Sequence, residues 1–95
     1  MLIEKAGAFS IVLECVQRQL AKKISNSIKI PTIGIGSSNN CDGQILVIDD
    51  ILGLTESKMK FVKKYADVKK IIAFGAKKFK KEVKAKIYPS KRYSY

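Results

Sequence analysis

Two short apolar runs, separated by a helix-length interval, constrain the fold of this chain more than any other feature. The runs are residues 9–15 and 30–36. The interval 17–28 repeats large apolar side chains at every fourth position, namely Leu20, Ile24 and Ile28. This spacing predicts an amphipathic helix between two strands. A strand, a helix and a second strand in that order are typical of parallel α/β structure.

The first run ends in a carboxylate, Glu14. Alternation along strand 9–14 places Ser10, Val12 and Glu14 on one face and Leu13 on the other. In parallel α/β enzymes the catalytic groups gather at the carboxyl ends of the strands. Glu14 is therefore a candidate catalytic residue, and the alternative is a carboxylate that only supports the structure through hydrogen bonds.

The second strand is predicted at 32–35, because Pro31 blocks continuation of the preceding helix. It leaves through Gly34 and Gly36 into the polar loop 37–40. This spacing lacks the third glycine of a dinucleotide-binding fingerprint. A turn that requires positive φ is therefore the expected role of these glycines, and close approach to a ligand is the alternative.

Three further helices are predicted in the second half of the chain. Apolar residues on nearly all sides of 41–52 predict a buried helix, capped by Asn40 or Asp42 and ended by Gly53. A short helix is expected around 59–65, and a long one over 67–86. The long helix has an apolar stripe formed by Val68, Ile72, Gly75, Phe79 and Val83.

Charge divides the chain into two unequal parts. Residues 1–57 hold five basic and six acidic side chains, whereas 58–95 hold fourteen basic and two acidic ones, giving net charges of −1 and +12. Many of the lysines lie opposite the apolar stripe of helix 67–86, namely Lys69, Lys70, Lys77, Lys80, Lys81 and Lys84. A solvated helix face is the ordinary interpretation of such an arc.

Composition excludes several kinds of site. The chain has no histidine, and its two cysteines, Cys15 and Cys41, are too few for a disulfide framework or a zinc site. No apolar run is long enough to span a bilayer and no signal peptide is visible, so a cytoplasmic setting is expected. The spacing of apolar residues in 1–8 resembles the last turn of a helix. We therefore expect this chain to be part of a longer protein.

Three segments of the sequence form a set of motifs in a fixed order. The first is residues 6–16, AGAFSIVLECV. The second is 30–36, IPTIGIG, which continues through CDGQILV at 41–47 to DILGL at 50–54. The third is KFVKKYA at 60–66. In this order the segments resemble ketopantoate hydroxymethyltransferases. The loop 37–40 departs from this pattern, because the family is richer there in glycine and alanine.

The resemblance implies an α/β fold, specifically the C-terminal fragment of a (β/α)8 TIM barrel. Residues 1–54 would form the last two βα units, and 55–95 the Lys-rich C-terminal helices and tail. The implied reaction transfers a one-carbon unit from 5,10-methylenetetrahydrofolate to 3-methyl-2-oxobutanoate, in pantothenate biosynthesis. Glu14 matches the glutamate that removes the proton beside the ketone.

The same resemblance places the ligands of the catalytic Mg2+ on earlier strands, outside this chain. We therefore expect the isolated 95-residue chain to be inactive, and the complete enzyme to form a homo-oligomer. The alternative is a basic nucleic-acid-binding or assembly module that uses the Lys-rich helix. Against nucleic acid, the sequence has no recognised binding motif and no aromatic cluster for base stacking.

Overall fold

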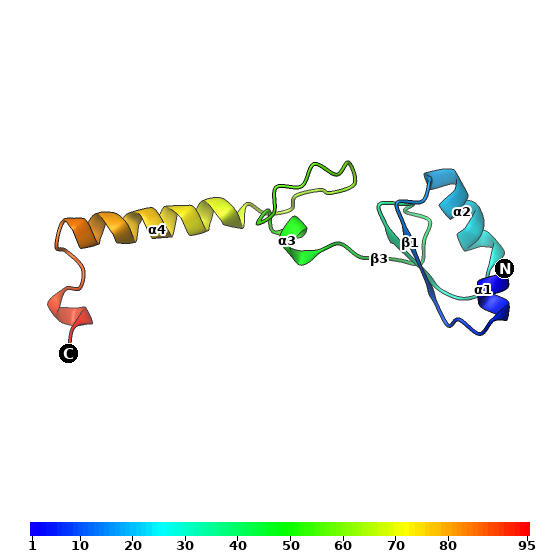
Figure 1. The fold of residues 1–95 in the computed structure, drawn as a ribbon, viewed down its shortest axis with the longest axis horizontal. Coiled ribbons are helices and arrows are strands. Elements are labelled where there is room, and N and C mark those ends of the chain that lie inside the picture. The colour runs from blue at the N-terminus through cyan, green and yellow to red at the C-terminus, as the bar shows by residue number, and fades with distance from the viewer.

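The computed structural model describes all 95 residues as an elongated α/β molecule. A small sheet with one helix against it lies at one end, and a long helix extends from the other (Figure 1). The elements in chain order are α1 (Leu2–Lys5), β1 (Ile11–Glu14), α2 (Arg18–Ser27), β2 (Thr32–Ile35), β3 (Gly43–Gln44), α3 (Ile48–Ile51), α4 (Val68–Lys84) and the 3₁₀ turn η1 (Lys91–Tyr93).

The sheet has three parallel strands in the order β1-β2-β3. Ile11 pairs with Thr32 and Glu14 with Ile35, so β1 and β2 are in register over their full lengths. The predicted strand–helix–strand order is therefore confirmed, although β1 begins at Ile11 rather than at residue 9. The third strand was not predicted.

The core lies between the sheet and α2. Leu13, Ala21 and Cys41 are buried together, and Ile11 and Ile24 pack against them. The buried face of α2 thus passes through Ala21, whereas the predicted anchor Leu20 is half exposed. Only seven of the 95 residues are buried, so this core is small for the chain that it holds.

The predicted buried helix over 41–52 is wrong. Gly43 and Gln44 pair with β2 instead, and the Ile45 amide donates to the Gly34 carbonyl at 3.0 Å. Only Ile48–Ile51 are helical, and Ile45 and Ile48 are more than half exposed. A continuous apolar run does not distinguish a helix from a strand, and here backbone pairing with β2 decides the outcome.

The short helix expected around 59–65 is also absent. This segment runs as an irregular loop that returns to α3, where the Tyr65 and Ala66 amides both donate to the Ile51 carbonyl. These bonds satisfy the carboxyl-terminal end of α3, whose last carbonyls have no partner inside the helix. The path of this loop is therefore set by its hydrogen bonds to α3, and the pattern of its own residues does not predict it.

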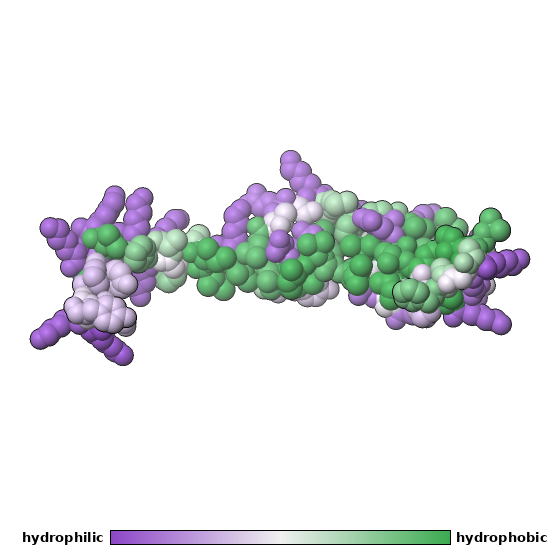
Figure 2. All heavy atoms as spheres, turned by 60° about the horizontal axis from the view of Figure 1, so that its bottom comes forward, coloured by the Kyte–Doolittle hydropathy of each residue, from purple (hydrophilic) through white to green (hydrophobic).

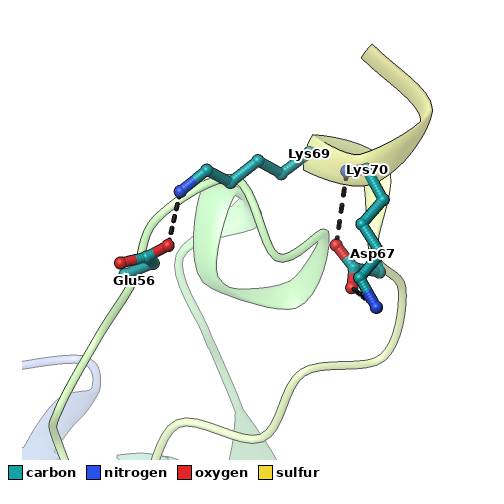
Figure 3. Close-up of polar contacts among 4 residues, drawn as sticks. All are labelled: Glu56, Asp67, Lys69 and Lys70. Atoms are coloured by element: carbon teal, nitrogen blue, oxygen red, sulfur yellow. Dashed lines mark hydrogen bonds and ion pairs between the residues drawn. The ribbon is translucent and has the colours of Figure 1, made fainter. Parts of the chain in front are cut away.

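The long helix α4 begins and ends close to its predicted limits. Asp67 caps its start by accepting a hydrogen bond from the Lys70 amide at 3.4 Å (Figure 3). Lys69 pairs with Glu56 at 2.5 Å, and this contact lowers the pKa of the Glu56 carboxyl. No residue of α4 is buried. None of the helices combines the length and the apolar character needed to cross a lipid bilayer.

The faces of α4 differ sharply in character. The predicted apolar stripe includes Ile72, Phe79 and Val83, each between 44% and 57% exposed. Figure 2 shows apolar side chains forming a band along much of the molecule, with hydrophilic side chains projecting around it. Lys69 and Lys70 are the lysines that make ion pairs, so the rest of the cationic arc has no carboxylate partner. The molecule measures 67 × 28 × 15 Å.

Candidate active site

The carboxyl ends of the strands meet at one edge of the sheet, because all three strands are parallel. Glu14 is the last residue of β1 and lies beside Ile35, the last residue of β2. Leu13 faces the core beneath α2, so the side chains of Val12 and Glu14 lie on the opposite face of the strand. That face carries no helix, and Val12 is 54% exposed on it.

A sharp turn follows Glu14. Cys15 has φ of 52°, in the left-handed region that a non-glycine residue adopts at a cost of about 1 to 2 kcal/mol. Its amide donates to the Ile35 carbonyl at 2.9 Å and extends the β1–β2 ladder by one bond. The chain therefore changes direction immediately after the carboxylate while remaining attached to β2.

The loop after β2 reaches back to this turn. The Ser37 hydroxyl accepts a hydrogen bond from the Val16 amide at 3.0 Å and donates one to the Leu13 carbonyl at 2.5 Å. Gly36 has φ of 65°, and a Cβ atom there would lie 2.5 Å from the Phe61 ring. The predicted need for positive φ is confirmed at Gly36, which also needs the space that the absent side chain leaves. It is wrong at Gly34, which is a strand residue of β2 without positive φ and is close to the Gln44 side chain instead.

A wide depression of about 790 Å³ opens beside these two loops. Its lining includes Arg18, Asn39 and Lys60, and the Arg18 guanidinium donates to Asn39 at 3.3 Å. No carboxylate lines it, so its electrostatics favour an anion. Glu14 is not among the lining residues, because its side chain lies on the other face of the sheet.

A second polar cluster lies at the opposite end of β2. Asp42 accepts hydrogen bonds from the Thr32 amide at 2.8 Å and from the Thr32 hydroxyl at 3.0 Å. These two bonds hold the pKa of the Asp42 carboxyl below its ordinary value, and the bond from the Thr32 amide contributes most. Ser25 of α2 joins the cluster through its contact with the Thr32 hydroxyl at 2.8 Å. The cluster ties α2, β2 and the segment before β3 together, so its role is structural.

Comparison with known proteins identifies the relatives of this chain. A sequence model of the family described as ketopantoate hydroxymethyltransferase matches residues 1–91. This chain belongs to the ketopantoate hydroxymethyltransferase family. The resemblance of its three sequence segments to that family is thereby confirmed.

Individual members of the family are similar over nearly the whole chain. The 3-methyl-2-oxobutanoate hydroxymethyltransferase of Pelagibacter ubique is 54% identical over 94 residues, which are 99% of this chain and 37% of that protein. The enzyme of the same name from Clostridium novyi is 51% identical over 98% of this chain and 34% of its own length. One from Francisella tularensis is 48% identical over 99% of this chain and 36% of its own. The chain therefore spans little more than a third of these relatives.

The side chains of this chain do not form a metal centre. No three histidine, cysteine, aspartate or glutamate side chains gather where they could hold one ion. Cys15 and Cys41 are both free thiols, one exposed and one buried. The residues of this chain therefore do not by themselves fit the Mg2+ that the family resemblance implies.

Two contacts at the carboxyl edge are not predicted by the sequence pattern. The pattern predicts only a polar loop around Ser37 and a short helix around Phe61. Their contacts, with Leu13 and Val16 for Ser37 and with Gly36 for Phe61, join residues more than 20 positions apart. A serine directly after a glycine at a predicted strand end was the available signal, since side chains there lie near the ends of neighbouring strands.

Proposed function

We propose that this chain provides the catalytic base and the C-terminal part of a 3-methyl-2-oxobutanoate hydroxymethyltransferase. The observation that carries the proposal is the 54% identity over 99% of the chain to an enzyme of that name. The position of Glu14 at the carboxyl edge of a parallel sheet supports it. The proposed role, in pantothenate biosynthesis, agrees with the cytoplasmic setting expected from the sequence.

We propose further that β1 and β2 belong to a (β/α)8 barrel. The two strands are parallel, α2 covers one face of them, and the other face carries Val12, Glu14 and Ile33 without a helix. This arrangement suits a barrel, in which helices lie outside and catalytic side chains sit at the carboxyl ends of the strands. Closure requires strands that this chain does not contain.

In the proposed reaction, the Glu14 carboxylate removes the proton from C3 of 3-methyl-2-oxobutanoate. The electron pair of the broken C–H bond moves into the ketone and forms an enolate. C3 then attacks the methylene carbon of 5,10-methylenetetrahydrofolate. Both bonds from that carbon to nitrogen break, and water supplies the hydroxyl of the hydroxymethyl product. The remaining proton of that water and the proton taken up by Glu14 go to the two nitrogens, which gives tetrahydrofolate and restores the carboxylate. A carboxylate at this position acts as a general base, a role worth about 10²- to 10⁴-fold in rate.

The depression that Arg18 and Lys60 line is positively charged, and this charge supports the assignment of anionic substrates. Both 3-methyl-2-oxobutanoate and the glutamate tail of the folate carry carboxylates, which Arg18 and Lys60 are suited to attract. Charge of one sign in a cleft raises the local concentration of oppositely charged ligands. We propose that this depression receives the anionic part of the folate at the rim of the site.

We also propose that the complete enzyme is a homo-oligomer. Ile72, Phe79 and Val83 leave one face of α4 apolar and exposed. Contiguous exposed apolar surface marks a site of protein contact. A second copy of the enzyme is the partner that the family resemblance implies.

The test of the proposed function replaces Glu14 in a full-length enzyme. A chimera is built in which this chain replaces the segment that it matches in the Pelagibacter ubique relative. Glu14→Gln keeps the size of the side chain but cannot accept the proton, so we expect turnover to fall by about a hundredfold or more. Glu14→Asp should recover only part of the rate, because the shorter side chain misplaces the carboxylate.

The measurement is deuterium incorporation at C3 of 3-methyl-2-oxobutanoate in D2O without folate, which isolates the proton transfer. The isolated 95-residue chain serves as a negative control, and we expect no turnover from it. Exchange at the parental rate in Glu14→Gln would assign the base to another residue and return Glu14 to a structural role.

A further inference from the structure

A single hydroxyl connects the loop after β2 to the turn that follows Glu14. Ser37 Oγ donates its proton to the Leu13 carbonyl at 2.5 Å and accepts the Val16 amide at 3.0 Å. A serine hydroxyl has one proton to donate. Both bonds therefore form at once only with the hydroxyl in this one orientation, which makes the contact a specific bridge.

The two groups that Ser37 binds flank Glu14 and Cys15. The Leu13 carbonyl precedes Glu14 directly, and the Val16 amide follows Cys15, the residue in the left-handed conformation. The Val16 amide makes no other hydrogen bond. Without the Ser37 hydroxyl, the far side of this turn would lose its connection to the loop after β2.

The Glu14 side chain has no comparable support of its own. It is exposed, and its carboxylate forms no hydrogen bond and no ion pair within the chain. Its direction therefore depends on the backbone from which it projects. That backbone is fixed on one side by the β1–β2 ladder and on the other by Ser37.

We propose that Ser37 is a positioning residue for Glu14, which holds the end of β1 so that the carboxylate meets the proton at C3 of the substrate. This inference rests on the proposed function of Glu14. The neighbouring Ser38 does not share the role, because its hydroxyl bonds with Asn40 inside the same loop. Displacement of a reacting group by about 1 Å can lower a rate by about a hundredfold, so the bridge has a measurable consequence.

The experiment compares substitutions at Ser37 in the full-length chimera. Ser37→Ala removes the hydroxyl, and we expect C3 deuterium exchange to slow about tenfold while KM for the keto acid changes less than about twofold. Ser37→Thr retains the hydroxyl and should restore exchange to within about threefold of the parent. Ser25→Ala is the matched control, because it removes a serine hydrogen bond at the far end of β2 and should leave the exchange rate unchanged.

A double-mutant cycle separates positioning from general loss of structure. If Ser37 acts through Glu14, the variant carrying both Glu14→Gln and Ser37→Ala should exchange no more slowly than Glu14→Gln alone. An additional tenfold loss in the double variant would show that Ser37 acts elsewhere, and parental exchange in Ser37→Ala would overturn the inference directly. Parental exchange in Glu14→Gln would instead overturn the assignment of the base, and with it the role of Ser37.

Amide hydrogen exchange gives a second test that does not depend on turnover. In the folded chimera the Val16 amide should be protected, and Ser37→Ala should remove that protection while Cys15, bonded to Ile35, retains it. Ser37→Thr should keep Val16 protected. Equal protection of Val16 in the parent and in Ser37→Ala would show that the hydroxyl does not hold the turn.

Discussion

The sheet region, residues 1–45, and the α4 region, residues 67–95, are held in different ways. In the sheet region, side-chain hydrogen bonds join residues far apart in sequence, such as Val16 with Ser37 and Lys29 with Glu4. In the α4 region, most bonds join near neighbours, as in the Asp67 cap and the contact of Ser94 with Ser90. The long-range bonds of the sheet region fix the positions of separate segments relative to one another. The local bonds of the α4 region stabilise only the helix and its ends. The candidate active site accordingly lies in the sheet region.

Among the substitutions that test the difference between the two regions, Thr32→Val is expected to have the largest effect. Thr32 is fully buried, and its hydroxyl bonds with the Ser25 hydroxyl, the Asp42 carboxylate and the Asp42 amide; Thr32→Val removes these bonds and keeps only the bond from the backbone amide to Asp42. We expect it to lower the free energy of unfolding of the chimera by about 1 to 3 kcal/mol. Urea denaturation measures this change. Ser27→Ala, which removes a local bond at the exposed end of α2, should have a much smaller effect.

The pH dependence of stability should also separate the two regions. The pKa of Asp42 lies below its ordinary value of 3.8 in the folded state, mainly because of the Thr32 amide. Its contribution is therefore fully present above that ordinary value and is lost as pH falls through the folded pKa. The parent should lose stability more steeply below pH 3.8 than Asp42→Asn does. Unfolding curves that fall in parallel for the two proteins would contradict this assignment.

A smaller effect is expected from Asp67→Ala at the start of α4. Loss of the cap should destabilise the helix by about 1 kcal/mol. Because the cap is local, we expect amide exchange to increase in the first turn of α4 and to stay unchanged in β1 and β2. Asp67→Ser, which also caps helices, should show little change. Increased exchange in the sheet would show that the two regions are coupled.

The smallest effect concerns the cationic arc of α4. If the unpaired lysines bind a nucleic-acid backbone, the binding should be weak and should fall steeply as salt increases, because it depends on counterion release. Titration of labelled DNA with the chimera at several salt concentrations provides the measurement. Replacing Lys77, Lys80, Lys81 and Lys84 with glutamine should abolish the binding. Sequence-specific binding that survives high salt would favour the alternative function.

The parts of the fold that follow from local pattern could be predicted from the sequence. Period-two alternation located β1, the three- and four-residue spacing located α2 and α4, and Gly36 marked the turn after β2. The parts that failed are set by distant partners. Residues 43–44 pair with β2 because that strand offers a free edge, and no property of 41–52 alone indicates it.

The candidate site divides in the same way. Glu14 could be identified because a carboxylate at the end of an apolar strand is locally unusual, and its proposed catalytic role stays a prediction. Ser37 is marked in the sequence only by its place directly after Gly36, because its proposed role depends on a turn that precedes it by more than 20 residues. The composition of a loop does not reveal which backbone groups its hydroxyls will meet.

The contact of Phe61 with Gly36 has a consequence for how this protein can evolve. The ring occupies the space that any side chain at position 36 would need, and the positive φ of Gly36 already disfavours other residues. Substitutions at the two positions are therefore linked: a larger residue at 36 becomes tolerable only after the ring at 61 has been lost or moved. Divergence in the irregular loop should thus precede divergence in the strand end, and related sequences that lack the glycine should also lack the aromatic residue.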